Sequence, residues 1–250
     1  TEYTYQKPEP VVPDASAISE TDIEKAATMI AHSKRPFVFV GGGVTLSNAS
    51  EELRRFVKKI DAPVADSLMG KGAFDGTDEA YAGMLGMHGN YAPNVKEQEC
   101  DVLIAIGMRF SDRVTGRLDT YAKQAKVIHL DIDPTEIDKN VKTDVAVLAD
   151  CKESLPALTK LIRKADHKEW IDSFKPLWQK ETDQVIEPSI HPTEGPLLMG
   201  EVVNAVAEAT NGEAVLVNDV GENQMFSARY FKYKRSRSIV TSGGAGTQQM

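Results

Sequence analysis

The chain has 250 residues, of which 41% are hydrophobic and 26% charged, as in an ordinary globular protein. Its net charge of −8 argues against nucleic acid as the main partner, and no apolar run approaches the ~20 residues that cross a membrane. Because the N-terminus lacks an export signal and Cys100 and Cys151 are isolated in the sequence, we expect a cytoplasmic protein.

The first quarter of the chain is expected to alternate helix and strand after a linker. Residues 1–18 are proline-rich and aperiodic, which is typical of an extended linker. Ser19 is the expected N-cap of an amphipathic helix, and a strand is expected over 37–40. Gly41-Gly42-Gly43 follows, and a second helix is expected from Asn48, with Glu51 completing a capping box and a buried stripe at Leu53, Phe56, Val57 and Ile60.

The middle of the chain predicts the centre of a parallel sheet. A strand is expected over 63–67, and residues 73–99 are expected to be loop and helix. Two short Val/Ile-rich runs, 102–106 and 127–132, are typical of strands buried on both faces. A further strand over 145–148 precedes a helix. This alternation predicts an α/β fold with a Rossmann-like parallel sheet flanked by helices.

After this sheet the pattern changes. Apolar residues on one helical face, Trp170, Phe174, Leu177 and Trp178, precede a boundary at Glu187-Pro188 and His191-Pro192. A helix is then expected over 196–210, followed by strands over 214–218 and 238–241, which together would form an incomplete second α/β unit. Its inward residues are expected to be Val202, Ala205, Val206 and Ala209.

Polar and glycine residues follow the predicted strands, where parallel sheets bind ligands. Gly41-Gly42-Gly43 is either a phosphate-binding turn or simply a tight turn between strand and helix. Arg109 and Arg113 are candidate phosphate ligands, with Asp112 orienting Arg113 through a salt bridge; the alternative is a solvated charged surface. Asp131 is the expected ribose contact, and Asp133 the cap of the following turn.

Two further clusters are weaker signals. The Met-rich run 84–89 suits either a flat aromatic ring or ordinary core packing, and His88 lacks partners at metal-ligand spacing. Residues 219–225 and Gly243–Gly246 both follow strands and are candidate phosphate turns. We expect no metal site within this chain.

Six motifs together make the chain similar to the large catalytic subunit of acetolactate synthase (acetohydroxyacid synthase), a thiamine-diphosphate enzyme family. They are V-G-G-G-V (40–44), M-L-G-M-H-G (84–89), R-F-S-D-R-V-T-G (109–116), H-L-D-I-D-P-T-E-I-D-K-N (129–140), V-G-E-N-Q-M (220–225) and S-G-G-A-G-T (242–247). The resemblance implies a linker (1–18), a central FAD-binding-like domain (19–165), a linker helix and boundary (166–195) and the start of a thiamine-diphosphate-binding domain (196–250).

The resemblance also implies chemistry. Two pyruvates, or pyruvate and 2-oxobutyrate, would condense with loss of CO₂ in branched-chain amino-acid synthesis, using FAD, magnesium and thiamine diphosphate. A homodimer or tetramer with a small regulatory subunit is implied as well. Because the chain starts at Thr1 and ends at Gln248-Gln249-Met250, we expect a fragment that is inactive alone.

Site residues are carried over by motif. The implied FAD contacts are Gly41, Gly42, Gly43, Ser67, Leu68, Met69, Leu85, Gly86, Met87, His88, Gly107, Met108, Arg109, Asp112, Arg113, Val114, Asp131, Ile132, Ala149 and Asp150. The implied substrate channel is bordered by Met87, Asp112 and Arg113, with Arg113 binding a carboxylate. Thiamine diphosphate would meet Val220, Gly221, Glu222, Asn223 and Gly246, although the family usually reads V-G-Q-H-Q where this chain has V-G-E-N-Q (220–224). No catalytic residue is implied within this chain.

Two alternatives stay open. A non-catalytic NAD/FAD-binding module would use Gly41–Gly43 with Asp66 as the ribose acid, which follows the glycines at about the ~20-residue spacing of that motif. The second alternative is a related thiamine-diphosphate enzyme, such as a glyoxylate carboligase or a pyruvate oxidase. All of these interpretations require the turns near 41, 107 and 131 to meet at one groove.

Overall fold

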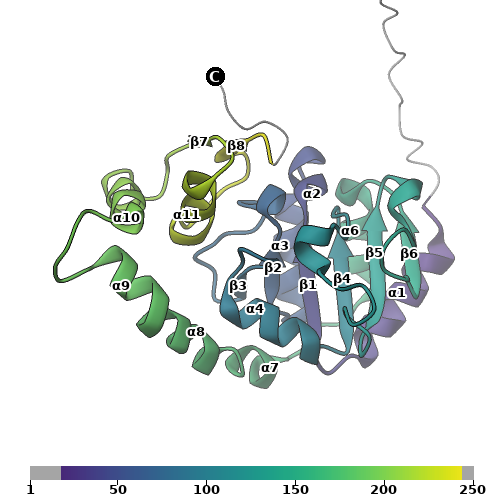
Figure 1. Cartoon of the computed structure of the whole chain (residues 1–250). Helices are drawn as coiled ribbons and strands as arrows, with labels where there is room; N and C mark the ends of the chain where they lie inside the picture. The colour runs from purple at the N-terminus through teal and green to yellow at the C-terminus, as the bar shows by residue number, and fades with distance from the viewer. Residues whose placement is uncertain (1–17, 244–250) are drawn as a thin grey trace, which may run out of the picture.

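A six-stranded parallel sheet forms the centre of the computed structural model, which describes residues 18–243 (Figure 1). Its strands lie in the order β3 (Tyr81–Met84), β2 (Val64–Asp66), β1 (Pro36–Val40), β4 (Val102–Ile106), β5 (Lys126–Asp131) and β6 (Val145–Leu148), and all neighbours are parallel. The chain direction across the sheet reverses between β1 and β4, which makes that position the topological switch point. The predicted α/β fold is therefore confirmed.

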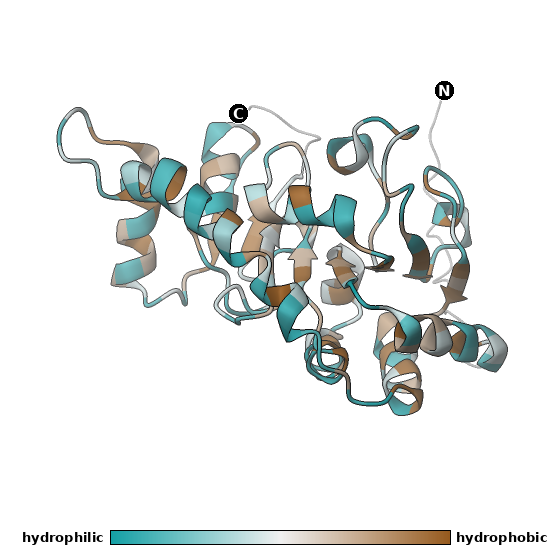
Figure 2. Cartoon of the chain, turned by 90° about the horizontal axis from the view of Figure 1, so that it is seen from below, coloured by the Kyte–Doolittle hydropathy of each residue, from teal (hydrophilic) through white to brown (hydrophobic). Residues whose placement is uncertain are grey.

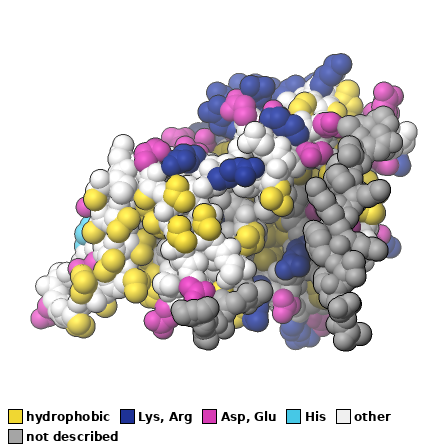
Figure 3. Space-filling view, turned by 90° about the horizontal axis from the view of Figure 1, so that it is seen from above, with side chains coloured by type: hydrophobic (Ala, Val, Ile, Leu, Met, Phe, Trp, Pro, Cys, Tyr) yellow, Lys and Arg dark blue, Asp and Glu magenta, His cyan; other side chains and the backbone are white. Residues whose placement is uncertain are grey.

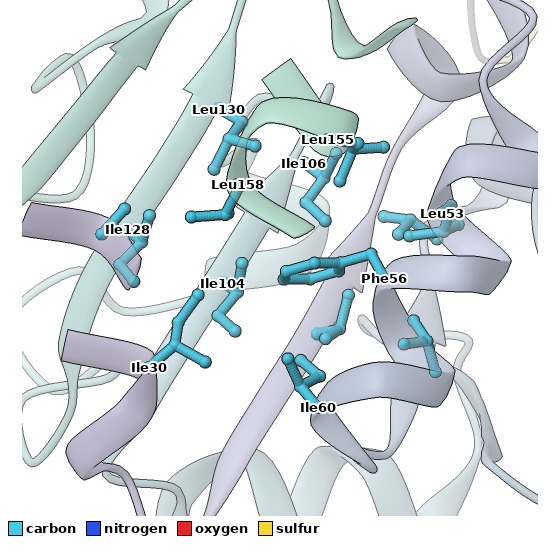
Figure 4. Close-up of a cluster of buried hydrophobic side chains, with 14 of the residues drawn as sticks. Ile30, Leu53, Phe56, Ile60, Ile104, Ile106, Ile128, Leu130, Leu155 and Leu158 are labelled. Carbon is cyan, nitrogen blue, oxygen red and sulfur yellow. The ribbon is translucent and has the colours of Figure 1, made fainter. Parts of the chain in front are cut away.

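Three helices cover one face of the sheet: α1 (Glu20–His32), α3 (Ser50–Ile60) and α6 (Cys151–Leu161). Their apolar stripes meet strand residues such as Ile104, Ile106 and Leu130 in one buried cluster (Figure 4). Ser19 caps α1 as predicted, because its side chain accepts from the amide of Asp22 at 3.3 Å. The predicted stripe of α3 is confirmed as well, since all four of its residues are buried.

The opposite face is covered by α4 (Tyr91–Lys96), α7 (Lys168–Asp172) and α8 (Lys175–Glu181), together with residues 108–122. Trp170 and Phe174 are buried there, and the Trp170 indole donates to the Pro36 carbonyl at 2.9 Å. Trp178 donates to the Ala82 carbonyl at 3.0 Å. The segment expected to be a linker helix thus supplies part of the core. Figure 2 shows mostly hydrophobic strands beside helices in which hydrophilic and hydrophobic residues alternate.

A smaller unit follows, with α10 (Met199–Ala209), β7 (Leu216–Asn218), α11 (Glu222–Tyr230) and β8 (Ile239–Thr241). The two strands pair in parallel. The predicted inward stripe of α10 is wrong: Val202 and Val206 are about two-fifths exposed, and Val203 is buried against Phe231 and Tyr233 instead. The helix is rotated because its packing partner is this small aromatic cluster. Figure 3 shows hydrophobic side chains gathered on the side of the molecule where this unit lies.

Short helical segments connect these elements: α2 (Gly42–Leu46), η2 (Leu68–Gly70), η3 (Glu97–Glu99), α5 (Asp112–Thr115), η4 (Pro134–Glu136), the π-helical η5 (Thr182–Ile186) and α9 (Glu187–Ile190). None of the helices between residues 18 and 243 has the length and apolar character needed to cross a bilayer.

Two local predictions are wrong. Asn48 does not cap the second helix, because α2 intervenes and Asn48 adopts a left-handed conformation (φ 55°) before the cap residue Ala49. Glu51 pairs instead with Arg54 and Arg55. Strand β3 was expected to be loop, since Ala82 and Gly83 are poor strand formers; its pairing with β2 makes it a strand.

Candidate functional site

The turns after β1, β4 and β5 lie side by side at the carboxyl edge of the sheet. The Gly41 amide donates to the Ile106 carbonyl at 3.0 Å, and the Gly107 amide donates to the Leu130 carbonyl at 2.8 Å. The three turns that the sequence analysis required to meet are therefore adjacent, at the switch point where parallel sheets bind ligands.

The glycine run after β1 is explained by the close approach of two turns. A Cβ on Gly41 would lie 2.4 Å from the Gly107 oxygen, and one on Gly43 would lie 2.6 Å from the Gly107 Cα. The Gly43 amide donates to the Gly107 carbonyl at 2.8 Å. The amides of Gly41 and Gly43 are thus used inside the protein, which favours the tight-turn interpretation for these two residues.

The segment after β4 alternates buried and exposed side chains. Met108 and Phe110 are buried, whereas Arg109, Asp112 and Arg113 are exposed. This alternation presents cationic groups at the edge while anchoring the backbone in the core.

Two residues that the sequence analysis missed hold this segment. His129 Nε2 lies 2.8 Å from the Met108 carbonyl oxygen, and Asn140 donates from Nδ2 to the Phe110 carbonyl at 2.7 Å. The His129 ring is fully buried and packs edge-on against Phe110. In the sequence, the one indication of a role for His129 and Asn140 is that they are the first and last residues of the 129–140 motif.

Arg113 contacts the Met87 loop rather than the expected partner. Its Nη1 lies 3.6 Å from Met87 Sδ, and the Met87 amide donates to the Arg113 carbonyl at 2.9 Å. Within residues 18–243, no ion pair joins Asp112 to Arg113, so the predicted salt bridge is wrong. Met87 and Arg113, predicted to border one channel, are in contact.

Of the two acids at the end of β5, Asp133 is the helix cap that was predicted. Asp133 caps η4 by accepting from the Thr135 amide at 2.9 Å, and hydrogen bonds from the Thr135 side chain and amide lower the Asp133 pKa. Asp131 is 9% exposed and accepts from the Asp133 amide at 2.9 Å. Asp150 caps α6 through the Lys152 amide, so that predicted adenosine contact also has a structural role.

Three large apolar side chains are exposed on the loops at this edge. Met69 is 52%, Met87 62% and Ile132 47% exposed. They accompany the exposed Arg109 and Arg113. Apolar surface beside cations fits a flat ring that carries phosphates. The predicted contacts Gly42, Ser67, Leu68, Gly86, His88, Val114 and Ala149 are half-buried or exposed along the same loops, and Leu85 is buried.

Most of the predicted thiamine-diphosphate residues follow β7. Val220 is half-buried, whereas Gly221, Glu222 and Asn223 are exposed where α11 begins. Gly246 lies outside the described residues. Within residues 18–243, no three His, Cys, Asp or Glu side chains gather as metal ligands would.

Asp66 is not available to a ribose. It is 1% exposed, lies 3.2 Å from Lys71 Nζ and accepts from the Tyr81 hydroxyl at 3.0 Å. The alternative NAD-binding interpretation therefore loses its acidic residue.

The strand order, with its switch point between β1 and β4, defines a Rossmann-type parallel α/β domain. The family described as "Thiamine pyrophosphate enzyme, central domain" matches residues 23–158, and the chain belongs to this family.

Within this family, the chain is similar to acetolactate synthase large subunits. The chain is 43% identical over 231 residues to a "Probable acetolactate synthase large subunit" of Methanocaldococcus jannaschii, covering 90% of this chain and 39% of that protein. It is 38% identical to the acetolactate synthase large subunit of Buchnera aphidicola subsp. Schizaphis graminum, with the same two coverages. It is 40% identical to acetolactate synthase 1, chloroplastic, of Nicotiana tabacum, covering 91% of this chain and 34% of that protein. The chain is thus a homologue of acetolactate synthase large subunits that spans less than two-fifths of their length.

Proposed function

We propose that the chain is the FAD-holding part of an acetolactate synthase, which condenses two pyruvates, or pyruvate and 2-oxobutyrate, with release of CO₂. The observation that carries this proposal is the meeting of the turns near 41, 107 and 131 at the switch point. Similarity to acetolactate synthases over nine-tenths of the chain supports the reaction.

The edge offers a suitable group for each part of FAD. The exposed guanidinium group of Arg109 presents a planar fork of donors for phosphate. Met69, Met87 and Ile132 would cover the flat ring, and Asp131 would accept from ribose. FAD would take no net redox part; thiamine diphosphate, when bound with magnesium, supplies the nucleophilic carbon.

Arg113 is the proposed contact for a substrate carboxylate. It is exposed, and its backbone is tied to the Met87 loop. Such an arginine binds and orients the 2-oxoacid, while the apolar Met87 beside it excludes water. We further propose a cytoplasmic homodimer or tetramer, with a small regulatory subunit as a partner.

The complete protein that carries this chain tests the proposal. Supplied with thiamine diphosphate, magnesium and FAD, it should form acetolactate from pyruvate. Arg113→Ala should raise the KM for pyruvate by about tenfold or more, because a charge-assisted hydrogen bond is lost. Arg117→Ala is the matched control, since Arg117 is exposed in the same segment and pairs with Asp119. Absence of acetolactate, or equal effects of the two substitutions, would contradict the proposal.

FAD binding is tested separately. The 250-residue chain should bind FAD only weakly, because part of the cradle comes from elsewhere, and it should not turn over pyruvate. Isothermal titration with FAD, and with NAD as competitor, measures this. Binding of NAD more tightly than FAD, or turnover of pyruvate by the chain alone, would count against this assignment.

A further inference from the structure

One buried acid accepts hydrogen bonds from the C-terminal end of the loop that carries Met87. Glu181, at the end of α8, is 6% exposed. Its Oε2 accepts from the Tyr91 amide at 2.9 Å and its Oε1 from Asn90 Nδ2 at 3.2 Å. Asn90 Oδ1 in turn accepts from the Met84 amide at 2.8 Å. Glu181, about 90 positions away along the chain, is thus bonded directly to Asn90 and Tyr91 and, through Asn90, to Met84.

A cation from the C-terminal unit reaches the same place. Arg229, near the end of α11, donates from Nη2 to the Gly89 carbonyl at 2.5 Å and lies 3.7 Å from Glu181 Oε1. A Cβ on Gly89 would lie 2.2 Å from the Met84 oxygen, so the two ends of the loop nearly touch. The guanidinium therefore joins α11, the loop and the acid of α8.

The other side of the loop contacts the predicted substrate arginine. Besides the Met87 amide bond to the Arg113 carbonyl, a Cβ on Gly86 would lie 2.8 Å from that same oxygen. The backbone of Gly86 and Met87 is therefore in direct contact with the backbone of Arg113. At its opposite end, α11 begins at Glu222, one of the predicted thiamine-diphosphate contacts.

We propose that Glu181 and Arg229 are positioning residues that couple α11 to the Met87 loop and, through it, to Arg113. Through these contacts, the charged side chains of Glu181 and Arg229 would set the position of Arg113 relative to α11. Helix α11 begins at Glu222, in the predicted diphosphate-binding turn. The consequence for catalysis rests on the proposed function, whereas the coupling itself belongs to this chain and is measurable without cofactor.

Amide hydrogen exchange on the 250-residue chain tests the coupling. Glu181→Gln keeps the shape of the side chain and removes its charge, and Arg229→Gln removes the cation. Each should speed exchange at the amides of Met84, Met87 and Tyr91 by about tenfold, because those bonds then open locally. Exchange in β4 and β5 should be unchanged, and Arg229→Lys should restore part of the protection.

Arg235→Gln is the matched control, because Arg235 donates within the C-terminal unit to the Glu213 carbonyl. Unchanged exchange at residues 84–91 in Arg229→Gln, or an equal increase throughout the sheet, would overturn the proposal. If Glu181→Gln does not fold, the Arg229→Gln variant still tests the proposal, because Arg229 is partly exposed and its replacement should be tolerated.

In the complete protein, Arg229→Gln should raise the KM for pyruvate several-fold more than it lowers kcat. If the complete protein forms no acetolactate, the proposed function is refuted. The coupling measured by hydrogen exchange does not depend on that result.

Discussion

At the scale of single residues, buried polar side chains stabilise the loops at the carboxyl edge of the sheet. His129 and Asn140 meet the carbonyl oxygens of Met108 and Phe110, one on each side of Arg109. Glu181 does the same for the Met87 loop. A buried carbonyl without a donor costs free energy, so His129 and Asn140 stabilise the backbone on both sides of Arg109.

Replacing His129 tests this at the residue scale. His129→Phe keeps an aromatic ring beside Phe110 but leaves the Met108 carbonyl without its donor. The free energy of unfolding should fall by about 1–3 kcal/mol in urea titrations. His191→Phe is the control, because His191 is exposed and pairs with the nearby Glu187 on the surface. A loss no larger than in the control would contradict the role of His129.

Glu97 predicts a pH dependence. Burial raises the pKa of this 2%-exposed carboxyl from 4.5 to about 7. The folded protein therefore holds the proton more tightly than the unfolded chain. The stability that this contributes is complete below pH 4.5 and is lost as the pH rises through about 7.

Glu97→Gln should remove that dependence. The free energy of unfolding of the wild type, relative to the variant, should fall by roughly 1–3 kcal/mol between pH 4.5 and 8. Urea titrations at several pH values measure the difference. Parallel pH profiles for the two proteins would show that Glu97 titrates normally.

At the scale of elements, the β1–α2 and β4–α5 connections pack directly on one another. The absence of side chains at Gly41 and Gly43 lets the backbone of Gly107 approach. Gly107 itself has φ +55°, a conformation that favours glycine. The glycine run is thus required for the two turns to meet, whatever ligand lies above them.

Alanine substitutions separate this packing role from a general preference for glycine. Gly43→Ala should lower the free energy of unfolding by about 1–3 kcal/mol, because its Cβ would overlap the Gly107 backbone. Gly42→Ala should cost clearly less, since its Cβ would lie 3.3 Å from Met69. Thermal and urea unfolding of both variants compare them. Equal losses would argue against the packing explanation.

At the scale of the whole molecule, α7 and α8 close the second face of the sheet. Phe174 stacks on Phe37 with ring centroids 6.0 Å apart, and Trp170 packs edge-on against Phe174. Aromatic residues of this size contribute a large share of a core. The helices beyond residue 165 are thus part of the fold of the sheet that precedes them.

Two truncated chains test this dependence. A chain of residues 18–165 should leave Phe37 and Phe39 uncovered, bind a hydrophobic dye and be cleaved rapidly by protease. A chain of residues 18–195 should unfold cooperatively and resist cleavage. Equal behaviour of the two chains would support the predicted boundary at residue 165 instead.

The sequence by itself determined the features that depend on neighbours along the chain. The Val/Ile runs of β4 and β5, the Ser19 and Asp133 caps and the stripe of α3 were predictable, because propensity and periodicity act locally. The parallel alternation then placed Gly41, Gly107 and Asp131 at one edge.

Only the tertiary structure decided the rest. Strand β3 exists through its pairing with β2, and α10 buries Val203 rather than Val202 because its partner is the Phe231–Tyr233 cluster. The roles of His129, Glu181 and Arg229 depend on partners between 21 and 140 positions away. Hydrogen bonds of this kind join groups that only the packed sheet and helices bring together, so no local pattern encodes them.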